Sequence, residues 1–454
     1  MNDDGLGNTT SKSKEIQVKI MYEHKRKRMN VEHDRLSSLP DDLIHKILSF
    51  MDTKLVVQTC VLSSRWRFVW TSTPYLKFST WGYSLLEFSN IVEHVLSGRN
   101  NEIDVYSVTL YFRGEVSQVF VKIIFNYAFS HNVQEMTITS TEKKNFPLSL
   151  FNSVTLKHLT LCGYPNLRVT SSLELPSLTT LHLHHVTLYD DNSDSYISKC
   201  VNLKNLTLDH CYMMGSCGFT ICHPQLLSLT LKFVHGVVKA IAPQLKNISL
   251  ALSYNDYFPC FENALPSLEK ADICIHYPCD ALKIINMLQQ LCSNKYLTIN
   301  MEILELLSSK MDLISNQPSP FANLETLKVY PLTEILIGQT QKKVDVSALV
   351  KSYLLDSSPN ATLTMVSREE VRAAKNETLA QECFLKIHCC WEDLSELISY
   401  EEQKVSCISS ELKYIEELLT HIPESKKVKM QELFASMCEE ADTVMNKTLE
   451  RLKI

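Results

Sequence analysis

Residues 203–208 read LKNLTL, which places leucine at the first, fourth and sixth positions. The pattern returns as LKHLTL at 156–161 and LTTLHL at 178–183, and ten copies follow one another at steps of 19 to 30 residues. The copies begin at Val105, Val133, Leu156, Leu178, Leu203, Leu226, Leu245, Leu268, Asn294 and Leu324. Each copy predicts a short strand whose apolar side is covered only when the next copy stacks against it. We therefore predict a solenoid with a curved parallel sheet over residues 105–366.

The open side of this sheet is the candidate binding surface. Period-two alternation places the residues two, four and six after each start on that side. A central column, mostly hydroxyl, is expected at Thr109, Thr137, Thr160, His182, Thr207, Thr230, Ser249, Asp272, Thr298 and Lys328. Threonine there is also explained by its fit to strands, so the larger and charged side chains are the better candidates for contacting a target protein. These are Tyr111, His158, His182, His184, Asp209, Lys232, Lys270, Tyr296, Lys328 and Tyr330.

A different pattern precedes the repeats, in residues 34–78. Pro40 stands at the start of a predicted helix whose apolar residues Leu43, Ile44, Ile47 and Leu48 follow helical spacing. Two more short helices are expected before residue 78. A unit this small buries too little surface to be robust alone, so we expect its first helix to dock onto another protein. The alternative is that the apolar stripe packs only against the chain's own next domain.

The segment DRLSSLPDDLIHKILSFMDTKLVVQTCVLSSRWRFVWTSTPYLKFS, residues 34–79, resembles a plant-type F-box. It departs from the common pattern at Ser64, where a lysine is frequent. The repeats are similar to those of plant F-box proteins with leucine-rich repeats. FANLETLKVYPL at 321–332 and LLDSSPNATLTM at 354–365 resemble the segment, called FBD, that often follows such repeats.

The F-box resemblance implies a partner, the Skp-type adaptor of a cullin-RING ubiquitin ligase. It also implies that the adaptor is bound by Leu39, Pro40, Ile44, Ile47, Leu48, Leu55 and Trp66.

The remaining segments have simpler compositions. Residues 1–33 are polar, contain the run KRKR at 25–28, and are predicted to be a disordered basic arm. The basic run is read either as a nuclear import signal or as a solvated linker. Residues 79–104 are expected to be a linker to the first repeat. Residues 367–454 predict two antiparallel helices that cap the solenoid, with an oligomerisation helix as the alternative.

Several chemistries are not predicted. The formal net charge of −6 argues against nucleic acid as a partner, and no apolar run reaches the roughly 18 residues that suggest a membrane span. No nucleotide-binding glycine motif or GxSxG motif occurs, so we predict neither a cofactor nor a catalytic site. Fifteen cysteines without a secretory leader pattern are expected to be reduced and intracellular.

One cluster in the sequence could suggest a metal. The segment DHCYMMGSCGFTICHP, residues 209–224, lacks the paired spacing of zinc fingers, and no metal is predicted from it. It contains His210, Cys211, Cys217, Cys222 and His223.

These observations predict an α/β protein with a small all-α F-box, a leucine-rich-repeat solenoid and a helical cap. Its expected function is that of a non-catalytic substrate-recognition subunit of an SCF-type (Skp-cullin-F-box) ubiquitin ligase, in the nucleus and/or cytoplasm. It would act as a monomer within a hetero-complex, with an unknown protein target. The alternatives are a repeat scaffold that recruits no ligase, and a small-molecule sensor, which would need a basic floor for an anionic cofactor.

Overall fold

The computed structural model describes most of the repeats and the helices before them. The described residues are 39–80, 83–112, 118–140, 151–169, 174–189, 197, 199–214, 219–252, 258–261, 265–276, 280–315, 317–331, 347–367, 370, 413, 431 and 435. The predicted basic arm, 1–33, lies outside them, as does nearly all of the predicted helical cap, 367–454.

A single parallel sheet forms the backbone of the described part of the chain, and its strands follow one another in sequence order. Twelve of its strands form a continuous row, while β7 (Tyr212–Met214) pairs only with β5. The row consists of β1 (Tyr75–Ser79), β2 (Ser107–Phe112), β3 (Glu135–Ser140), β4 (His158–Val169), β5 (Thr180–Tyr189), β6 (Asn205–Asp209), β9 (Ser228–Lys232), β11 (Asn247–Leu252), β13 (Lys270–Ile275), β14 (Tyr296–Asn300), β15 (Thr326–Tyr330) and β16 (Thr362–Met365). This order is that of a solenoid, in which each repeat contacts its neighbours in sequence.

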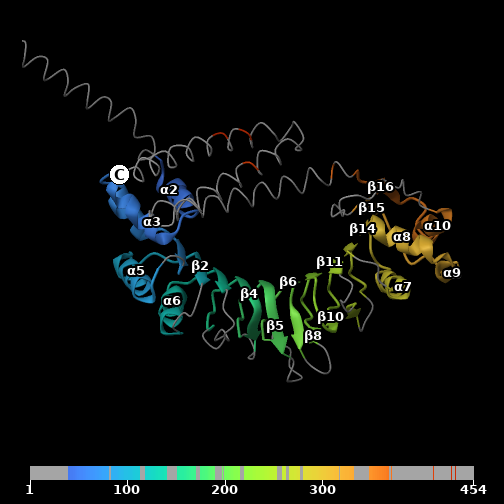
Figure 1. The fold of residues 1–454 in the computed structure, drawn as a ribbon, viewed down its shortest axis with the longest axis horizontal. Coiled ribbons are helices and arrows are strands. Elements are labelled where there is room, and N and C mark those ends of the chain that lie inside the picture. Colours follow the sequence, from blue (N-terminus) through green and yellow to red (C-terminus); the bar gives the residue numbers. More distant parts are fainter. Residues whose placement is uncertain are drawn as a thin grey trace, which may run out of the picture.

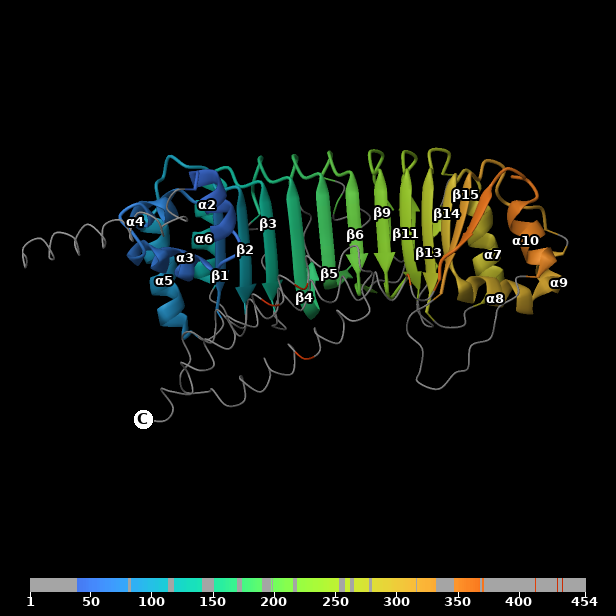
Figure 2. The same cartoon turned by 90° about the horizontal axis from the view of Figure 1, so that it is seen from above.

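The row of strands bends into an arc, with the other elements of the repeats on its outer side (Figures 1 and 2). Helices α5 (Leu85–Gly98) and α6 (Gln118–Ser130) lie behind the first strands. A second parallel sheet lies behind the middle, formed by β8 (Phe219–Cys222), β10 (Val238–Ile241) and β12 (Cys260–Phe261). The end of the arc carries α7 (Ala281–Gln290), α8 (Met301–Ser309), α9 (Met311–Ile314) and α10 (Ala348–Leu355).

The core of the arc is built from the predicted leucine positions. The ten residues that begin the predicted copies are at most 4% exposed. Strands such as β2 and β13 alternate between buried and accessible residues, as period-two geometry requires. The prediction of a leucine-rich-repeat solenoid is therefore confirmed.

The sheet register also places the predicted central column in one line across the strands. Thr109 pairs with Thr137, which pairs with Thr160, and Thr160 pairs with His182. The same line continues from His182 to Lys328 through Thr207, Thr230, Ser249, Asp272 and Thr298. The side chains two residues before and two residues after this line form two flanking columns on the same face.

The segment 79–104 is not the linker expected from the sequence. It contains the 14-residue helix α5, which begins with a capping box formed by Ser84 and Glu87. Phe88 and Val92 from this helix are buried in the main core. Strand β1, placed at the end of the predicted F-box, pairs in parallel with β2. The first repeat therefore begins at β1 and α5, because α5 has an apolar face that the arc can cover.

The N-terminal helices form a small unit at the start of the arc (Figure 2). They are α2 (Asp41–Leu48), α3 (Thr53–Gln58), η1 (Thr59–Val61), α4 (Trp66–Val69) and η2 (Trp70–Ser72). Pro40 precedes α2 directly, and the side chain of Asp52 caps α3 by accepting the N–H of Lys54 at 2.9 Å. None of the helices within the described residues is both long enough and apolar enough to cross a bilayer.

Close contacts attach this helical unit to the first repeat. The backbone N–H of Lys77 in β1 donates to Thr53 Oγ1 in α3 at 2.6 Å. The buried guanidinium of Arg99, at the end of α5, donates to the carbonyl of Thr73 and, at 3.2 Å, to Tyr127 Oη in α6. A Cβ on Gly98 would lie 2.8 Å from the ring of Trp70, so only glycine allows α5 to approach η2 this closely.

Asn294 offers a test of the repeat core, because it occupies a slot that is apolar in the other copies. Its side chain is fully buried, and its Nδ2 and Oδ1 atoms have no hydrogen-bond partner within the described residues. The substitution Asn294→Leu should raise the free energy of unfolding by about 1–3 kcal/mol, because it removes an unsatisfied buried amide. Urea denaturation measures the change. Asn247→Leu, at an exposed position, is the control, with an expected effect within about 0.5 kcal/mol. A less stable Asn294→Leu variant would contradict this account.

Candidate functional site

The N-terminal helical unit has a core of its own. Ile44 and Leu48 from α2 pack with Val56, Trp66 and Val69, and each of the five is at most 8% exposed. Ile44, Leu48 and Trp66 were predicted to bind the adaptor, but the chain itself covers them. They can support a binding surface from beneath, but because they are buried they cannot contact a partner themselves.

The helical repeat of α2 explains this division. Residues four apart lie on the same edge of a helix, so Ile44 and Leu48 form one edge of the apolar stripe while Leu43 and Ile47 form the other. Trp66 and Val56 pack with Ile44 and Leu48, which turns the second edge outward. The sequence shows the whole stripe, but the packing of α3 and α4 decides which edge remains accessible.

Six large apolar side chains on this unit are exposed, and we call them the exposed apolar set. Leu43, Ile47 and Phe50 continue one line along α2 and its C-terminal end. The other three come from the end of η1 and from α4. The exposed fractions are 51% for Leu43, 41% for Ile47, 54% for Phe50, 84% for Val61, 61% for Leu62 and 67% for Phe68. Isolated apolar side chains are common on surfaces, whereas six on so small a unit suggest a binding surface.

Charged side chains lie beside the exposed apolar set. Lys46 Nζ lies 5.6 Å from the centre of the Phe50 ring, and Arg65 in the segment before α4 forms an ion pair with Asp41 at the start of α2. Such a mixture of apolar residues and a polar rim is typical of protein interfaces.

The other predicted adaptor residues occupy different positions. Pro40 and Ile47 are exposed, whereas Leu39 and Leu55 are half-buried. Leu43, Phe50, Val61, Leu62 and Phe68 were missing from the predicted set. The spacing of residues 43, 47 and 50 was the signal that could have identified those of α2.

The predicted target-contacting residues all lie on strands of the arc, at positions that alternate with the buried leucines. Six of the ten are exposed and four are half-buried. The exposed ones are His158, His182, Lys232, Lys270, Tyr296 and Lys328, and the half-buried ones are Tyr111, His184, Asp209 and Tyr330. The structure therefore places them on one extended face.

Three predicted lysines influence the pKa of Asp272 in the C-terminal half of the arc. Burial raises the pKa of Asp272, while the positive charges of Lys270, Lys232 and Lys328 and a hydrogen bond from Tyr330 oppose that rise. Burial likewise raises the pKa of the Tyr330 hydroxyl. The three lysines belong to β9, β13 and β15, which are far apart in the sequence. Stacking of parallel strands lets all three act on one carboxylate, because residues far apart in sequence share a face.

A shallow hollow of about 370 Å³ joins the helical unit to the start of the arc. It lies between Lys46 and Ser49 of the α2 region and Tyr75, Lys77, Tyr106 and Glu135 of the first repeats. The hydroxyl of Tyr106 donates to Glu135 Oε1 at 2.9 Å, which holds one wall in place. Sequence patterns could not show this hollow, because its residues belong to different repeats and to the helical unit.

The histidines and cysteines of segment 209–224 occupy separate positions in the structure. Cys211 is buried, and burial raises the pKa of its thiol to about 12. His223 is also buried, with Nε2 lying 2.9 Å from the carbonyl oxygen of Cys200. Cys222 is exposed, and Cys217 lies outside the described residues. His210 lies instead near the histidines of β5.

A pair of substitutions separates the supporting residues of α2 from the accessible ones. Ile44→Ala should lower the free energy of unfolding of the helical unit by about 2–5 kcal/mol, because it leaves a cavity in a packed core. Leu43→Ala, one residue earlier but half exposed, should change it by about 0.5 kcal/mol or less. Hydrogen exchange of the α2 amides measures both changes. Equal effects at the two positions would show that the division of the stripe is wrong.

Asp272 predicts a pH dependence with a definite sign. A carboxyl whose pKa is raised by folding binds more protons in the folded state, so stability falls as pH rises above the unfolded value of about 3.9. Asp272→Asn removes this loss of stability, because asparagine does not titrate. The stability of the variant relative to the wild type should therefore increase between pH 3 and pH 7, as measured by urea denaturation. The same substitution at exposed Asp312 is the control. A relative stability that falls over this range would contradict the prediction.

Comparisons with known proteins agree with this architecture. A model of the F-box domain matches residues 36–78, and a model described as "FBD-associated F-box protein At5g56370, LRR repeats" matches residues 122–259. The F-box/LRR-repeat protein At3g26922 of Arabidopsis thaliana is 34% identical over 295 residues, which are 61% of this chain and 92% of that protein. The F-box protein At4g09920 of the same plant is 30% identical over 59% of this chain and 87% of its own length.

The names of some longer relatives include a further module, FBD. The F-box/FBD/LRR-repeat protein At3g26920 of Arabidopsis thaliana is 32% identical over 203 residues, which are 44% of this chain and 47% of that protein. The chain thus aligns with about half the length of this relative and with most of the two above. The matched domains, the relatives and the solenoid agree, and the chain belongs to the family of F-box proteins with leucine-rich repeats.

Proposed function

We propose that this protein is the substrate-recognition subunit of an SCF-type ubiquitin ligase. In this proposal the exposed apolar set binds a Skp-type adaptor, and the concave face of the arc holds a target protein. The chain forms no covalent bond itself, because ubiquitin transfer takes place on other subunits. The observation that carries the proposal is the exposed apolar set on the F-box helices.

The energetics favour a partner for this set. Burying one large aliphatic or aromatic side chain contributes about 1.5–3 kcal/mol, and all six side chains are at least 41% exposed. Docking several of them would contribute enough to overcome the loss of freedom on association. The inner core supports this surface, because Ile44 and Leu48 hold α2 against α3 and α4.

The arc supplies the second half of the proposed function. Its concave face offers an extended set of hydroxyl, histidine, lysine, aspartate and tyrosine side chains on a rigid sheet. Such a surface binds a protein through many moderate contacts. A receptor that holds both adaptor and target raises the effective concentration of target lysines near the conjugating enzyme, so proximity accounts for the rate increase.

Adaptor binding tests the first half directly. Leu43→Asp and Ile47→Asp should each weaken binding of a purified Skp-type adaptor by at least about 100-fold, because each would bury an unpaired carboxylate in the interface. Isothermal titration calorimetry measures the affinity, and circular dichroism confirms that the variants are folded. Val201→Asp is the matched control, since Val201 is 54% exposed in the repeats, far along the chain from the F-box. The control should bind like the wild type.

A failure of adaptor binding would favour the alternative function, that of a repeat scaffold. If the folded wild-type chain fails to bind the adaptor, the protein is a repeat scaffold that recruits no ligase. If Leu43→Asp and Ile47→Asp bind normally, the exposed apolar set is not the adaptor surface.

A further inference from the structure

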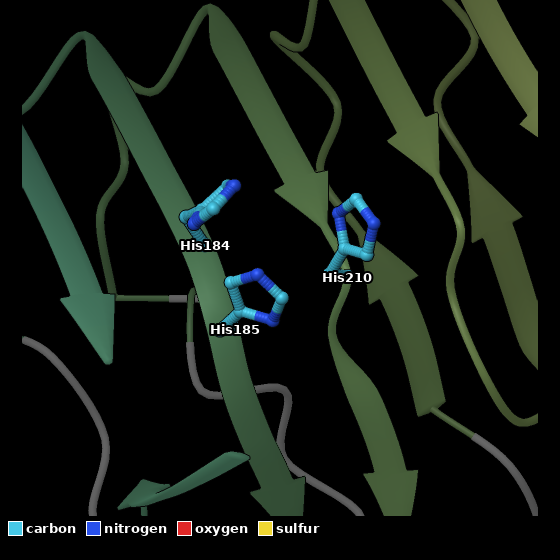
Figure 3. A group of neighbouring side chains, drawn as sticks. All are labelled: His184, His185 and His210. Atoms are coloured by element: carbon cyan, nitrogen blue, oxygen red, sulfur yellow. The ribbon is translucent and has the colours of Figure 1, made fainter. Parts of the chain in front are cut away.

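Three histidines meet on the arc where β5 and β6 lie side by side. His184 and His185 are consecutive residues of β5, and His210 directly follows β6 (Figure 3). Each offers a ring nitrogen, and the three nitrogens lie within 4.8 Å of one another. The ring centroids are 4.4 Å apart for His184 and His185, and 4.7 Å apart for His185 and His210. All three residues are half-buried.

The backbone explains how two consecutive histidines can share one site. In a regular strand, adjacent side chains point to opposite faces. His185 has a φ of 52° and His210 a φ of 50°, both in the left-handed region. This conformation breaks the alternation, so that His185 approaches His184, and His210 approaches its neighbour Asp209. Histidine is one of the residues that tolerate this region, although the conformation is uncommon outside glycine.

Asp209 orients the cluster. It pairs across the sheet with His184, and its Oδ2 lies 3.7 Å from His184 Nε2. Its Oδ1 lies 2.6 Å from His210 Nδ1. Because a carboxylate only accepts hydrogen bonds, Nδ1 of His210 carries the proton, and Nε2 keeps its lone pair for another partner. A carboxylate that fixes the tautomer of a histidine in this way is typical of metal sites.

Coordination requires the neutral form of each of the three histidines. A neutral imidazole presents a lone pair to a metal ion, whereas an imidazolium cannot.

We propose that His184, His185 and His210 bind a divalent transition-metal ion, with Zn²⁺ as the reference ion. Zinc–nitrogen bonds of about 2.0–2.1 Å place two ligands of a tetrahedral site roughly 3.4 Å apart. The nitrogens therefore need to approach one another by up to about 1.4 Å, which changes of side-chain torsion can supply. Three protein ligands leave a fourth coordination position open, as in sites that exchange a ligand.

This site departs from the expectation of no metal, and it changes the assignment of His184 from a target contact to a ligand. It differs from the cysteine and histidine set of segment 209–224, of which it uses only His210. It also stands independently of adaptor binding, since its residues belong to the repeats.

Metal titration of the purified full chain tests the proposal. The probe is Co²⁺, followed by competition with Zn²⁺. A site with only histidine ligands should show the visible ligand-field bands of Co²⁺ without a thiolate charge-transfer band, which separates it from binding by any of the 15 cysteines. The double substitution His185→Asn and His210→Asn should remove one equivalent of this signal. Asparagine is chosen because it also tolerates the left-handed backbone.

Two further variants sharpen the result. His182→Asn is the matched control, because His182 lies two residues from His184 on the same face and should leave the signal unchanged. Asp209→Asn should keep the stoichiometry but weaken binding by about 10- to 100-fold, as expected for loss of an orienting carboxylate.

The wild-type chain provides a test that does not depend on the folding of variants. Diethyl pyrocarbonate labels accessible imidazoles, and mass spectrometry locates the labels. Zn²⁺ should protect His184, His185 and His210 but not His158 or His182. Equal labelling with and without Zn²⁺, or a Co²⁺ spectrum that survives the double substitution, would overturn the proposal.

Discussion

The structure depends on the stacking of apolar side chains between successive parallel strands. No single repeat covers its own leucines, so each strand is stable only against its neighbours. The ten predicted start positions are at most 4% exposed, and the register carries one column of outward side chains from β2 to β15 without a slip. This constraint turns a short sequence motif into a long rigid surface. It also explains why residues from distant repeats, such as Lys232 and Lys328, act on the same carboxylate.

The F-box helices must also cover their apolar side chains, but they do so in another way. They are too few to cover all of their apolar residues, so the unit divides them between an inner core and an accessible surface. Ile44 and Leu48 pack inward, while Leu43 and Ile47 remain exposed. The small core needs support from the arc, which Arg99 and the close approach at Gly98 provide. In the proposed complex the adaptor covers the apolar side chains that the F-box leaves exposed, and the contacts between the F-box and the first repeat hold the adaptor at the start of the proposed target-binding face.

Local breaks in the alternation of a strand bring together side chains that a regular strand would place on opposite faces. Alternation would separate His184 from His185, but a left-handed residue at the same point of neighbouring strands brings their rings together with His210. Phe233, equivalent to His210 in the next strand, has a φ of 49°, and its ring centroid lies 4.8 Å from that of His210 with the rings tilted by 41°. The end of the strand is therefore a position where successive repeats can gather aromatic side chains in a line.

The sequence by itself determined the solenoid, the order of its strands, the buried leucines and the outward columns, because these follow from a short-range pattern with period two. It also located the F-box and the apolar stripe of its first helix. Only the tertiary structure decided which edge of that stripe faces outward, that residues 79–104 hold a packed helix, that lysines of three repeats act on Asp272, and that three histidines meet. These features depend on contacts between separate elements and on backbone angles at single residues, and neither leaves a periodic signal in the sequence.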